Sequence, residues 1–229
     1  MNARYALPMS TTRTPLHVLV TGFEPFGDEP VNPSMQAVLG LAAEPPPGVV
    51  LRTEILPVSF GRTGQALRAA LARHRPDVVI ATGQAGGRPE ISVERVGINV
   101  NDFRIPDNDG AQPVDVPVVE AGPAAYFATL PVKAVVAALR AAGRPASLSN
   151  TAGTHLCNHT LYLLGHLEAT EYPGMRFGFL HLPWLPEQIT RNPGQPSMAA
   201  ATVVAALRTA IATIAATSAD LRVAEGTLH

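Results

Sequence analysis

A single cysteine, Cys157, lies in the run Ser149-Asn-Thr-Ala-Gly-Thr-His-Leu-Cys157. This run predicts the end of a strand, a turn of small residues and then the start of a helix. A thiol in the first turn of a helix faces the positive end of the helix dipole, which stabilises the reactive thiolate. A lone cysteine is more often a buried, inert residue, but such a residue is expected among large apolar side chains inside an element. Cys157 is therefore a candidate nucleophile.

A thiol nucleophile needs a proton acceptor, usually a histidine, and a third group that orients the imidazole. Of the seven histidines, His181 ends a predicted strand just before Pro183. His155 and His159 flank the thiol, but sequence neighbours rarely meet a nucleophile at the right angle. We therefore expect His181 to be the base, and the alternative is a rim histidine that only makes hydrogen bonds. The remaining histidines are at positions less suited to this role: His17, His74, His166 and His229.

The orienting acid is harder to select, because the candidate loops contain Glu24, Asp28, Glu90, Glu94, Asp102 and Asp107. Glu94 lies in an otherwise apolar alternation, so we expect it to be partly buried and paired. The alternative is an ordinary surface pair with Arg95. Arg104 is suited to stabilising an oxyanion alongside the backbone N–H of Cys157. Its alternative is a salt bridge to Asp107 or Asp109 that fixes the loop.

Two aromatic residues, Phe23 and Phe26, lie in the glycine-bounded turn Gly22-Phe-Glu-Pro-Phe-Gly27. Two exposed aromatic side chains in such a turn are unusual, and they could form the walls of a pocket for a small flat ligand. The alternative is that both side chains fold back into the core.

The elements that must position these residues alternate between short apolar runs and helical patterns. Strands are expected at 17–21, 49–57, 77–83, 146–151 and 176–182. Helices are expected from Pro33 with Asn32 as N-cap, at 64–74 and 131–142, from about Cys157, and after a cap at Ser197. This alternation predicts a mostly parallel, twisted sheet covered on both faces, a three-layer α/β/α sandwich. A looser alternation at 91–105 predicts an antiparallel excursion.

In open α/β sheets the active crevice lies beyond the carboxyl ends of the strands. The clusters at 22–27, 83–88, 151–157 and 181–183 follow predicted strands, so we expect them to converge on one rim. The segment 16–229 is expected to be a single catalytic domain, and residues 1–15 a flexible N-terminal extension.

Composition narrows the class of protein. The chain has 229 residues, 46% hydrophobic and 15% charged, with a net charge of −1. These values indicate a globular protein and argue against a nucleic-acid partner. One cysteine excludes an intramolecular disulfide. The segment 198–218 is apolar but alanine-rich, which predicts a core helix or subunit contact rather than a membrane span. Without a signal-peptide pattern, we expect a cytoplasmic protein.

These motifs resemble those of the pyrrolidone-carboxylate peptidases, the pyroglutamyl peptidase I family of cysteine peptidases. The resemblance covers nearly the whole chain from about residue 16. It rests on five stretches that match motifs of the family: Thr21-Gly-Phe-Glu-Pro-Phe-Gly27 with Val31-Asn-Pro-Ser34, Gly83-Gln-Ala-Gly-Gly-Arg88 with Glu94-Arg-Val96, Arg104-Ile-Pro-Asp-Asn108, Ser149 to Asn158, and Gly178-Phe-Leu-His-Leu-Pro183.

The resemblance implies roles for individual residues. The family's Glu–Cys–His triad falls on Glu94, Cys157 and His181. Its oxyanion arginine falls on Arg104, and its two pocket phenylalanines fall on Phe23 and Phe26. Gln84 is expected to offer a backbone group to the substrate. The implied activity is hydrolysis of the bond after an N-terminal pyroglutamyl residue, without cofactor or metal, by a homo-oligomer, commonly a homotetramer.

Two residues depart from the family pattern, and two other functions are alternatives to a peptidase. Phe103 and Gly97 each replace a usual alanine, and Phe103 is expected to crowd Arg104. A metal site would require His155, Cys157 and His159 to share one face of a strand. A nucleotide loop at 83–88 lacks both the Gly-x-Gly-x-x-Gly spacing and a following helix.

Overall fold

A computed structural model describes residues 15–226. Eight strands alternate with five α-helices and one 3-10 helix at Pro186–Thr190. The strands are β1 (Leu16–Phe23), β2 (Val49–Leu56), β3 (Val78–Gln84), β4 (Ile91–Glu94), β5 (Val96–Ile98), β6 (Ala125–Phe127), β7 (Ala146–Ser149) and β8 (Arg176–Leu182). The helices are α1 (Pro33–Ala43), α2 (Thr63–His74), α3 (Val132–Ala141), α4 (Leu156–Thr170) and α5 (Ala200–Ala216). The expected extension at 1–15 and His229 lie outside the described residues, apart from Pro15.

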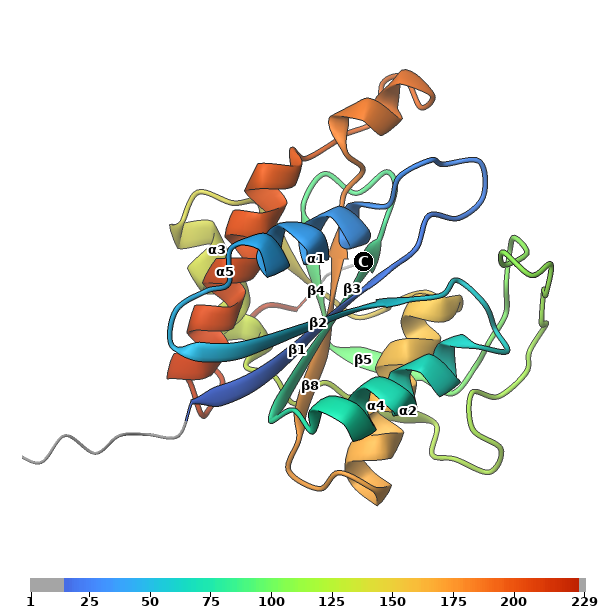
Figure 1. Ribbon diagram of the computed structural model, residues 1–229, viewed down its shortest axis with the longest axis horizontal. Coiled ribbons are helices and arrows are strands. Elements are labelled where there is room, and N and C mark those ends of the chain that lie inside the picture. Colours follow the sequence, from blue (N-terminus) through green and yellow to red (C-terminus); the bar gives the residue numbers. More distant parts are fainter. Residues whose placement is uncertain (1–14, 227–229) are drawn as a thin grey trace, which may run out of the picture.

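Six strands form one sheet in the order β2-β1-β3-β8-β4-β7. The sheet is twisted (Figure 1). Strands β2, β1, β3 and β8 are parallel to one another, which confirms the prediction of a mostly parallel sheet. β4 is antiparallel to β8 and parallel to β7. The expected antiparallel excursion therefore begins inside the main sheet, and it continues in the separate β5–β6 pair.

The four predicted clusters line one cavity, as expected, but the direction of β7 shows that the segment 151–157 does not reach this cavity directly from the end of a strand. β4 runs against β8 and β7 runs parallel to β4, so the carboxyl end of β7 does not point to the edge reached by β3 and β8. The chain instead returns after Ser149 through residues 150–155 to the start of α4. This return brings the helix start, and the thiol on it, back to the end of β3.

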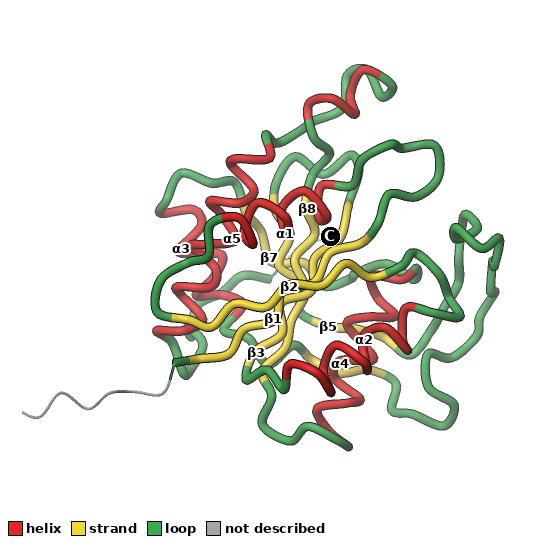
Figure 2. Tube along the Cα trace, in the orientation of Figure 1, coloured by secondary structure: helices red, strands yellow, loops and turns green. Residues whose placement is uncertain are grey.

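The helices cover the sheet in two layers (Figures 1 and 2). On one face, α1, α3 and α5 pack together over an aliphatic core that includes Val20, Ile80 and Leu207. On the other face, α2 and α4 cover a core in which aromatic residues such as Phe177 and Phe179 are fully buried. The result confirms the three-layer α/β/α sandwich. None of the helices from residue 15 to 226 has the length and apolar character that a bilayer crossing requires.

Helix starts show where local sequence signals hold. Asn32 caps α1 as expected: its side-chain oxygen accepts from the Ser34 N–H at 2.9 Å, and Pro33 begins the helix. Ser34 in turn accepts from the Phe23 N–H at 2.9 Å, which ties the end of β1 to the start of α1. The predicted cap Ser197 is wrong, because α5 begins after Ala199 and no side chain caps it.

Asn32, which caps a helix, and Ser197, which does not, allow the stabilising effect of an N-cap to be measured. Asn32→Ala should lower the free energy of unfolding by about 1–2 kcal/mol, because a buried cap is lost. Ser197→Ala should change it by less than about 0.5 kcal/mol, since its hydroxyl caps no helix. Urea unfolding of both variants measures the difference, and equal effects would contradict the assignment.

Candidate active site

The thiol of Cys157 lies at the second position of α4 and is half-buried, as the strand–turn–helix pattern predicts. It faces the end of β3 at very close range. A Cβ atom placed on Gly83 would lie 2.7 Å from the Cys157 sulfur, so only glycine allows this approach. The sulfur is therefore held between the helix start and the sheet.

Glu94 and His181 form a buried pair beside the thiol. His181 Nδ1 lies 2.7 Å from Glu94 Oε1, and the two side chains are 5% and 0% exposed. Antiparallel pairing of β4 with β8 sets Glu94 opposite Phe179 and brings its carboxylate to the imidazole two residues further along. The alternative pair with Arg95 is wrong, because Glu94 pairs with His181 and with Arg88.

The electrostatics of this pair favour a charged imidazole. Burial of the ring favours its neutral form, but the negative charge of Cys157 and a hydrogen bond to it act in the opposite direction. The hydrogen bond and the charge of Glu94 add to that effect, and the pKa of His181 is raised to about 9. With its Nδ1 bonded to Glu94, His181 has Nε2 free to face the sulfur.

The flanking histidines are engaged elsewhere. The His155 ring stacks on Phe103 with centroids 3.8 Å apart, and its Nε2 lies 3.3 Å from the Ile105 carbonyl oxygen. Burial lowers its pKa. Nδ1 of His159 lies 3.0 Å from the Asn101 side-chain oxygen, and burial lowers its pKa to about 4. Neither histidine is therefore placed as a base for Cys157.

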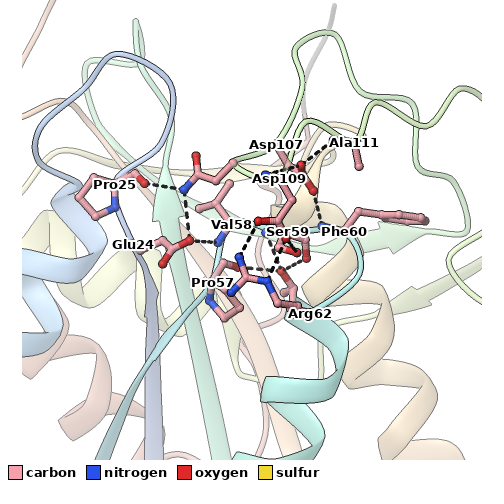
Figure 3. Close-up of polar contacts among 12 residues, drawn as sticks. Glu24, Pro25, Pro57, Val58, Ser59, Phe60, Arg62, Asp107, Asp109 and Ala111 are labelled. Atoms are coloured by element: carbon pink, nitrogen blue, oxygen red, sulfur yellow. Dashed lines mark hydrogen bonds and ion pairs between the residues drawn. The ribbon is translucent and has the colours of Figure 1, made fainter.

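The loop that carries Arg104 is clamped to the segment 57–62 by two carboxylates, those of Asp107 and Asp109 (Figure 3). Asp107 accepts from the backbone N–H groups of Phe60, Asp109 and Ala111. Asp109 forms two hydrogen bonds with Arg62, at 2.8 and 2.9 Å. Both acids are thus engaged, and the alternative that Arg104 pairs with one of them is wrong.

Glu24 links this loop to the turn that bears the two phenylalanines. One of its carboxylate oxygens accepts from the Val58 N–H at 2.9 Å and from the Asn108 side chain at 3.1 Å (Figure 3). Arg104 is exposed, lines the cavity next to Cys157 and makes no ion pair with any residue between 15 and 226. Its guanidinium is therefore available to a ligand.

A cavity of about 410 Å³ opens over the thiol. A small apolar recess adjoins it and is lined by Phe23, Phe26, Val58, Gln84, His155, Leu156 and Cys157. The expectation of two exposed phenylalanines needs correction. Phe23 is the last residue of β1, is only 3% exposed and packs in the core, whereas Phe26 is half-buried. Both rings nevertheless line the recess.

Gln84 also lines both hollows, but its side chain points to a structural partner. Its amide oxygen accepts from the Gln188 side chain at 2.9 Å. Gln188 is itself buried and bonds to Glu29 at 3.1 Å. The side-chain oxygen of Gln84 is thus held by a structural partner, and the expected role of a backbone group near Gln84 stays a prediction.

The two departures from the family pattern have structural explanations. Phe103 does not crowd Arg104: its ring is buried, stacks on His155 and meets Phe60 edge-on at 5.8 Å. Gly97 lets β5 lie directly on α4, since a Cβ there would be 2.6 Å from the Tyr162 nitrogen.

The alternative chemistries lack their required elements. Cys157 and His159 lie on α4 and not on a strand, so the three-ligand strand face is wrong. The loop at 83–88 leads into strand β4, whereas a phosphate loop would lead into a helix.

Arg88 is the residue of the site to which sequence reasoning gave no role. Its Nη1 donates to Glu94 Oε1 at 2.8 Å. The only available signal was its position in a glycine-rich turn six residues before an isolated acid, which is too weak to identify a partner.

Comparison with known proteins places this geometry in a family. The family model for pyroglutamyl peptidase matches residues 16–217. The chain is 58% identical to the pyrrolidone-carboxylate peptidase of Streptomyces coelicolor, covering 93% of this chain and 99% of that one. It is 56% identical to the corresponding protein of Cupriavidus taiwanensis at the same coverage, 93% and 99%.

Solved structures agree. Pyroglutamyl peptidase I from Bacillus amyloliquefaciens superposes with a TM-score of 0.89 at 41% identity, covering 92% of this chain and 100% of that one. The pyrrolidone carboxyl peptidase of Thermococcus litoralis gives 0.87 at 35% identity, with 91% and 99% covered. The chain belongs to the pyroglutamyl peptidase family.

Proposed function

We propose that this protein is a cysteine peptidase that hydrolyses the amide bond after an N-terminal pyroglutamyl residue. Cys157 is the nucleophile, His181 the general base and acid, and Glu94 the group that orients the imidazole. The observation that carries the proposal is the buried 2.7 Å contact between Glu94 and His181, next to a thiol at a helix start. Family membership supports the same activity.

In the acylation step, His181 holds the proton from the Cys157 thiol, and the thiolate attacks the pyroglutamyl carbonyl carbon. The carbonyl electron pair moves to oxygen, which becomes an oxyanion in the tetrahedral intermediate. The intermediate collapses, the C–N bond breaks and the imidazolium gives its proton to the departing amine. A thioester and a neutral His181 remain.

In the deacylation step, neutral His181 removes a proton from water while the water oxygen attacks the thioester carbonyl. Collapse of the second intermediate releases pyroglutamate, and the sulfur leaves as thiolate opposite the imidazolium. The backbone N–H of Cys157 and the guanidinium of Arg104 are the donors proposed for both oxyanions. Such a donor contributes about 2.7–4 kcal/mol in other enzymes.

Substrate selection follows from the apolar recess beside the thiol. A pyroglutamyl ring is a flat, uncharged lactam, and Phe23 and Phe26 line the recess that would hold it. Its N–H and C=O need partners, because an unpaired buried amide costs about 1–3 kcal/mol. We assign these partners to backbone groups near Gln84 and around 151–156. A free α-ammonium would be rejected from this recess.

We further propose that residues 16–229 act as one catalytic domain, that the chain forms a homo-oligomer and that it works in the cytoplasm. Exposed apolar side chains, Phe127 on β6 at 65% and Val114 in the segment between β5 and β6 at 68%, support a subunit contact. The cytosol keeps thiols reduced, so an unpaired nucleophilic cysteine is compatible with that location.

The activity is tested with a panel of fluorogenic amides. The wild-type protein should hydrolyse the pyroglutamyl amide and neither its prolyl nor its glutamyl counterpart. Cys157→Ala and Cys157→Ser should be inactive with unchanged circular dichroism, and iodoacetamide should inactivate the wild type. Turnover that survives in either variant would remove Cys157 as the nucleophile.

The pH dependence follows from the raised pKa of His181. Because His181 is cationic below about pH 9, kcat/KM should fall as the pH rises through that value and the proton donor is lost. Glu94→Gln removes a charge that stabilises the imidazolium, so this basic limb should move to lower pH. Glu90→Gln, at the position just before β4, is the control. If the basic limb of the kcat/KM profile stays at the same pH in Glu94→Gln, Glu94 does not stabilise the charged form of His181.

The recess is tested by truncating its half-buried ring. Phe26→Ala should raise KM for the pyroglutamyl amide about tenfold, because an aromatic contact with the lactam is lost. Phe127→Ala, which removes an exposed ring on the β5–β6 pair, should leave KM unchanged. If both variants behave alike, Phe26 does not contact the substrate.

A further inference from the structure

Arg88 contacts Glu94, the acid of the proposed catalytic group. It follows β3 in the turn at 85–88, where its backbone N–H bonds to the Ala85 carbonyl at 3.3 Å. The Ala85 N–H bonds to the Leu182 carbonyl at 2.9 Å, so this turn is fixed to the end of the strand that carries His181. Arg88 is therefore held by the same two strands that hold the imidazole.

The hydrogen bonds of Glu94 converge on one atom. Oε1 accepts from Arg88 Nη1 at 2.8 Å and lies 2.7 Å from His181 Nδ1. Oε2 is buried and accepts from no residue between 15 and 226. A second guanidinium nitrogen of Arg88 reaches the Thr151 carbonyl oxygen at 3.4 Å. The guanidinium thus supplies one of the two hydrogen bonds that orient a fully buried carboxylate.

We propose that Arg88 is a positioning residue of the catalytic group, which keeps Glu94 ionised and aimed at His181 in both protonation states of the imidazole. This inference rests on the proposed function. The proposed cycle makes His181 neutral in the acyl-enzyme, and at that stage Glu94 would have no cation beside it if Arg88 were absent. A buried carboxylate without a counter-charge takes up a proton instead, and it would then no longer stabilise the imidazolium that each turnover forms.

Among the described residues, only Arg88 and His181 form ion pairs with Glu94, so Arg88 is the cation that can stay beside it when His181 is neutral. On the sheet, β7 offers no acid, base or cation to Glu94, because its sequence is Ala-Ser-Leu-Ser. The side chain of Arg88 is 34% exposed: its guanidinium contacts the buried Glu94 carboxylate and also lines the cavity over the thiol. The other titratable or charged groups that face the cavity are His181 from β8, Cys157 and His155 from the start of α4, and Asp102 and Arg104 from the clamped loop.

The test compares Arg88→Met, which removes the charge, with Arg95→Met, which removes a neighbouring arginine that makes no ion pair with Glu94. Arg88→Met should lower kcat by about 10- to 100-fold, the loss seen when groups that orient metal-bound histidines are removed. Because a proton binds the Glu94–His181 pair more readily without the cation, the acidic limb of the kcat–pH profile should also move to higher pH. Arg95→Met should change neither property.

A purely structural role would lower kcat without moving the profile. An acidic limb at the same pH in Arg88→Met and Arg95→Met would therefore overturn the proposal. Arg88→Lys retains the cation but cannot contact Glu94 and the Thr151 carbonyl oxygen at the same time. It should therefore lower kcat and leave the acidic limb of the kcat–pH profile in place. A displaced acidic limb in Arg88→Lys would count against the proposal even if Arg88→Met does not fold. Wild-type turnover of the pyroglutamyl amide tests the proposed function separately, and only its absence would refute that function.

Discussion

A single buried carboxylate, that of Glu94, governs how the rest of the site is arranged. Its side chain has no exposure to solvent, and its carboxylate contacts the charged side chain of Arg88 and the imidazole of His181. Burying such a charge is unfavourable unless hydrogen-bonding partners surround it. The protein meets this requirement with His181 from β8 and Arg88 from the turn after β3, so the two partners come from elements that are adjacent in the sheet.

The topology of the sheet makes this arrangement possible. β4 is short and runs against β8, which places the carboxylate beside the strand that ends in the imidazole. β7 follows β4 in parallel and sends the chain back to α4, whose second residue is the thiol. Gly83 then allows the sulfur to contact the sheet. The reversal of two strands, which interrupts an otherwise parallel sheet, is thus what assembles the catalytic group.

Sequence reasoning predicted the parts of this arrangement that local signals determine. The thiol at a helix start and the histidine at a strand end follow from turn residues and apolar runs near Cys157 and His181. The looser alternation that begins at Ile91 predicts the antiparallel direction of β4, and the pairing with β8 confirms it. The direction of β7 could not be predicted, because a four-residue strand carries no signal of its orientation. The burial of Phe23 was missed for a related reason: β1 extends past Gly22 through pairing with β2, a tertiary contact.

The partner of Glu94 shows the same limit at the level of one residue. Arg95 is its neighbour in sequence and directly follows the last residue of β4, but side chains of successive residues in extended chain point to opposite faces. Arg88 reaches the carboxylate only because the turn at 85–88 folds back against the end of β8. Contacts of this kind depend on how segments return in space, and no spacing rule within one sequence identifies them.

The most direct test of the account identifies the atom that becomes acylated. A pyroglutamyl chloromethyl ketone, in which a chloromethyl carbon takes the place of the leaving nitrogen, alkylates the attacking nucleophile and releases chloride. It should be allowed to react until activity is lost, and the modified residue located by peptide mass spectrometry. We expect one adduct per chain, on the sulfur of Cys157, with 2-pyrrolidone slowing its formation. Complete modification of another residue with the thiol intact, or full activity after Cys157 is alkylated, would contradict the account.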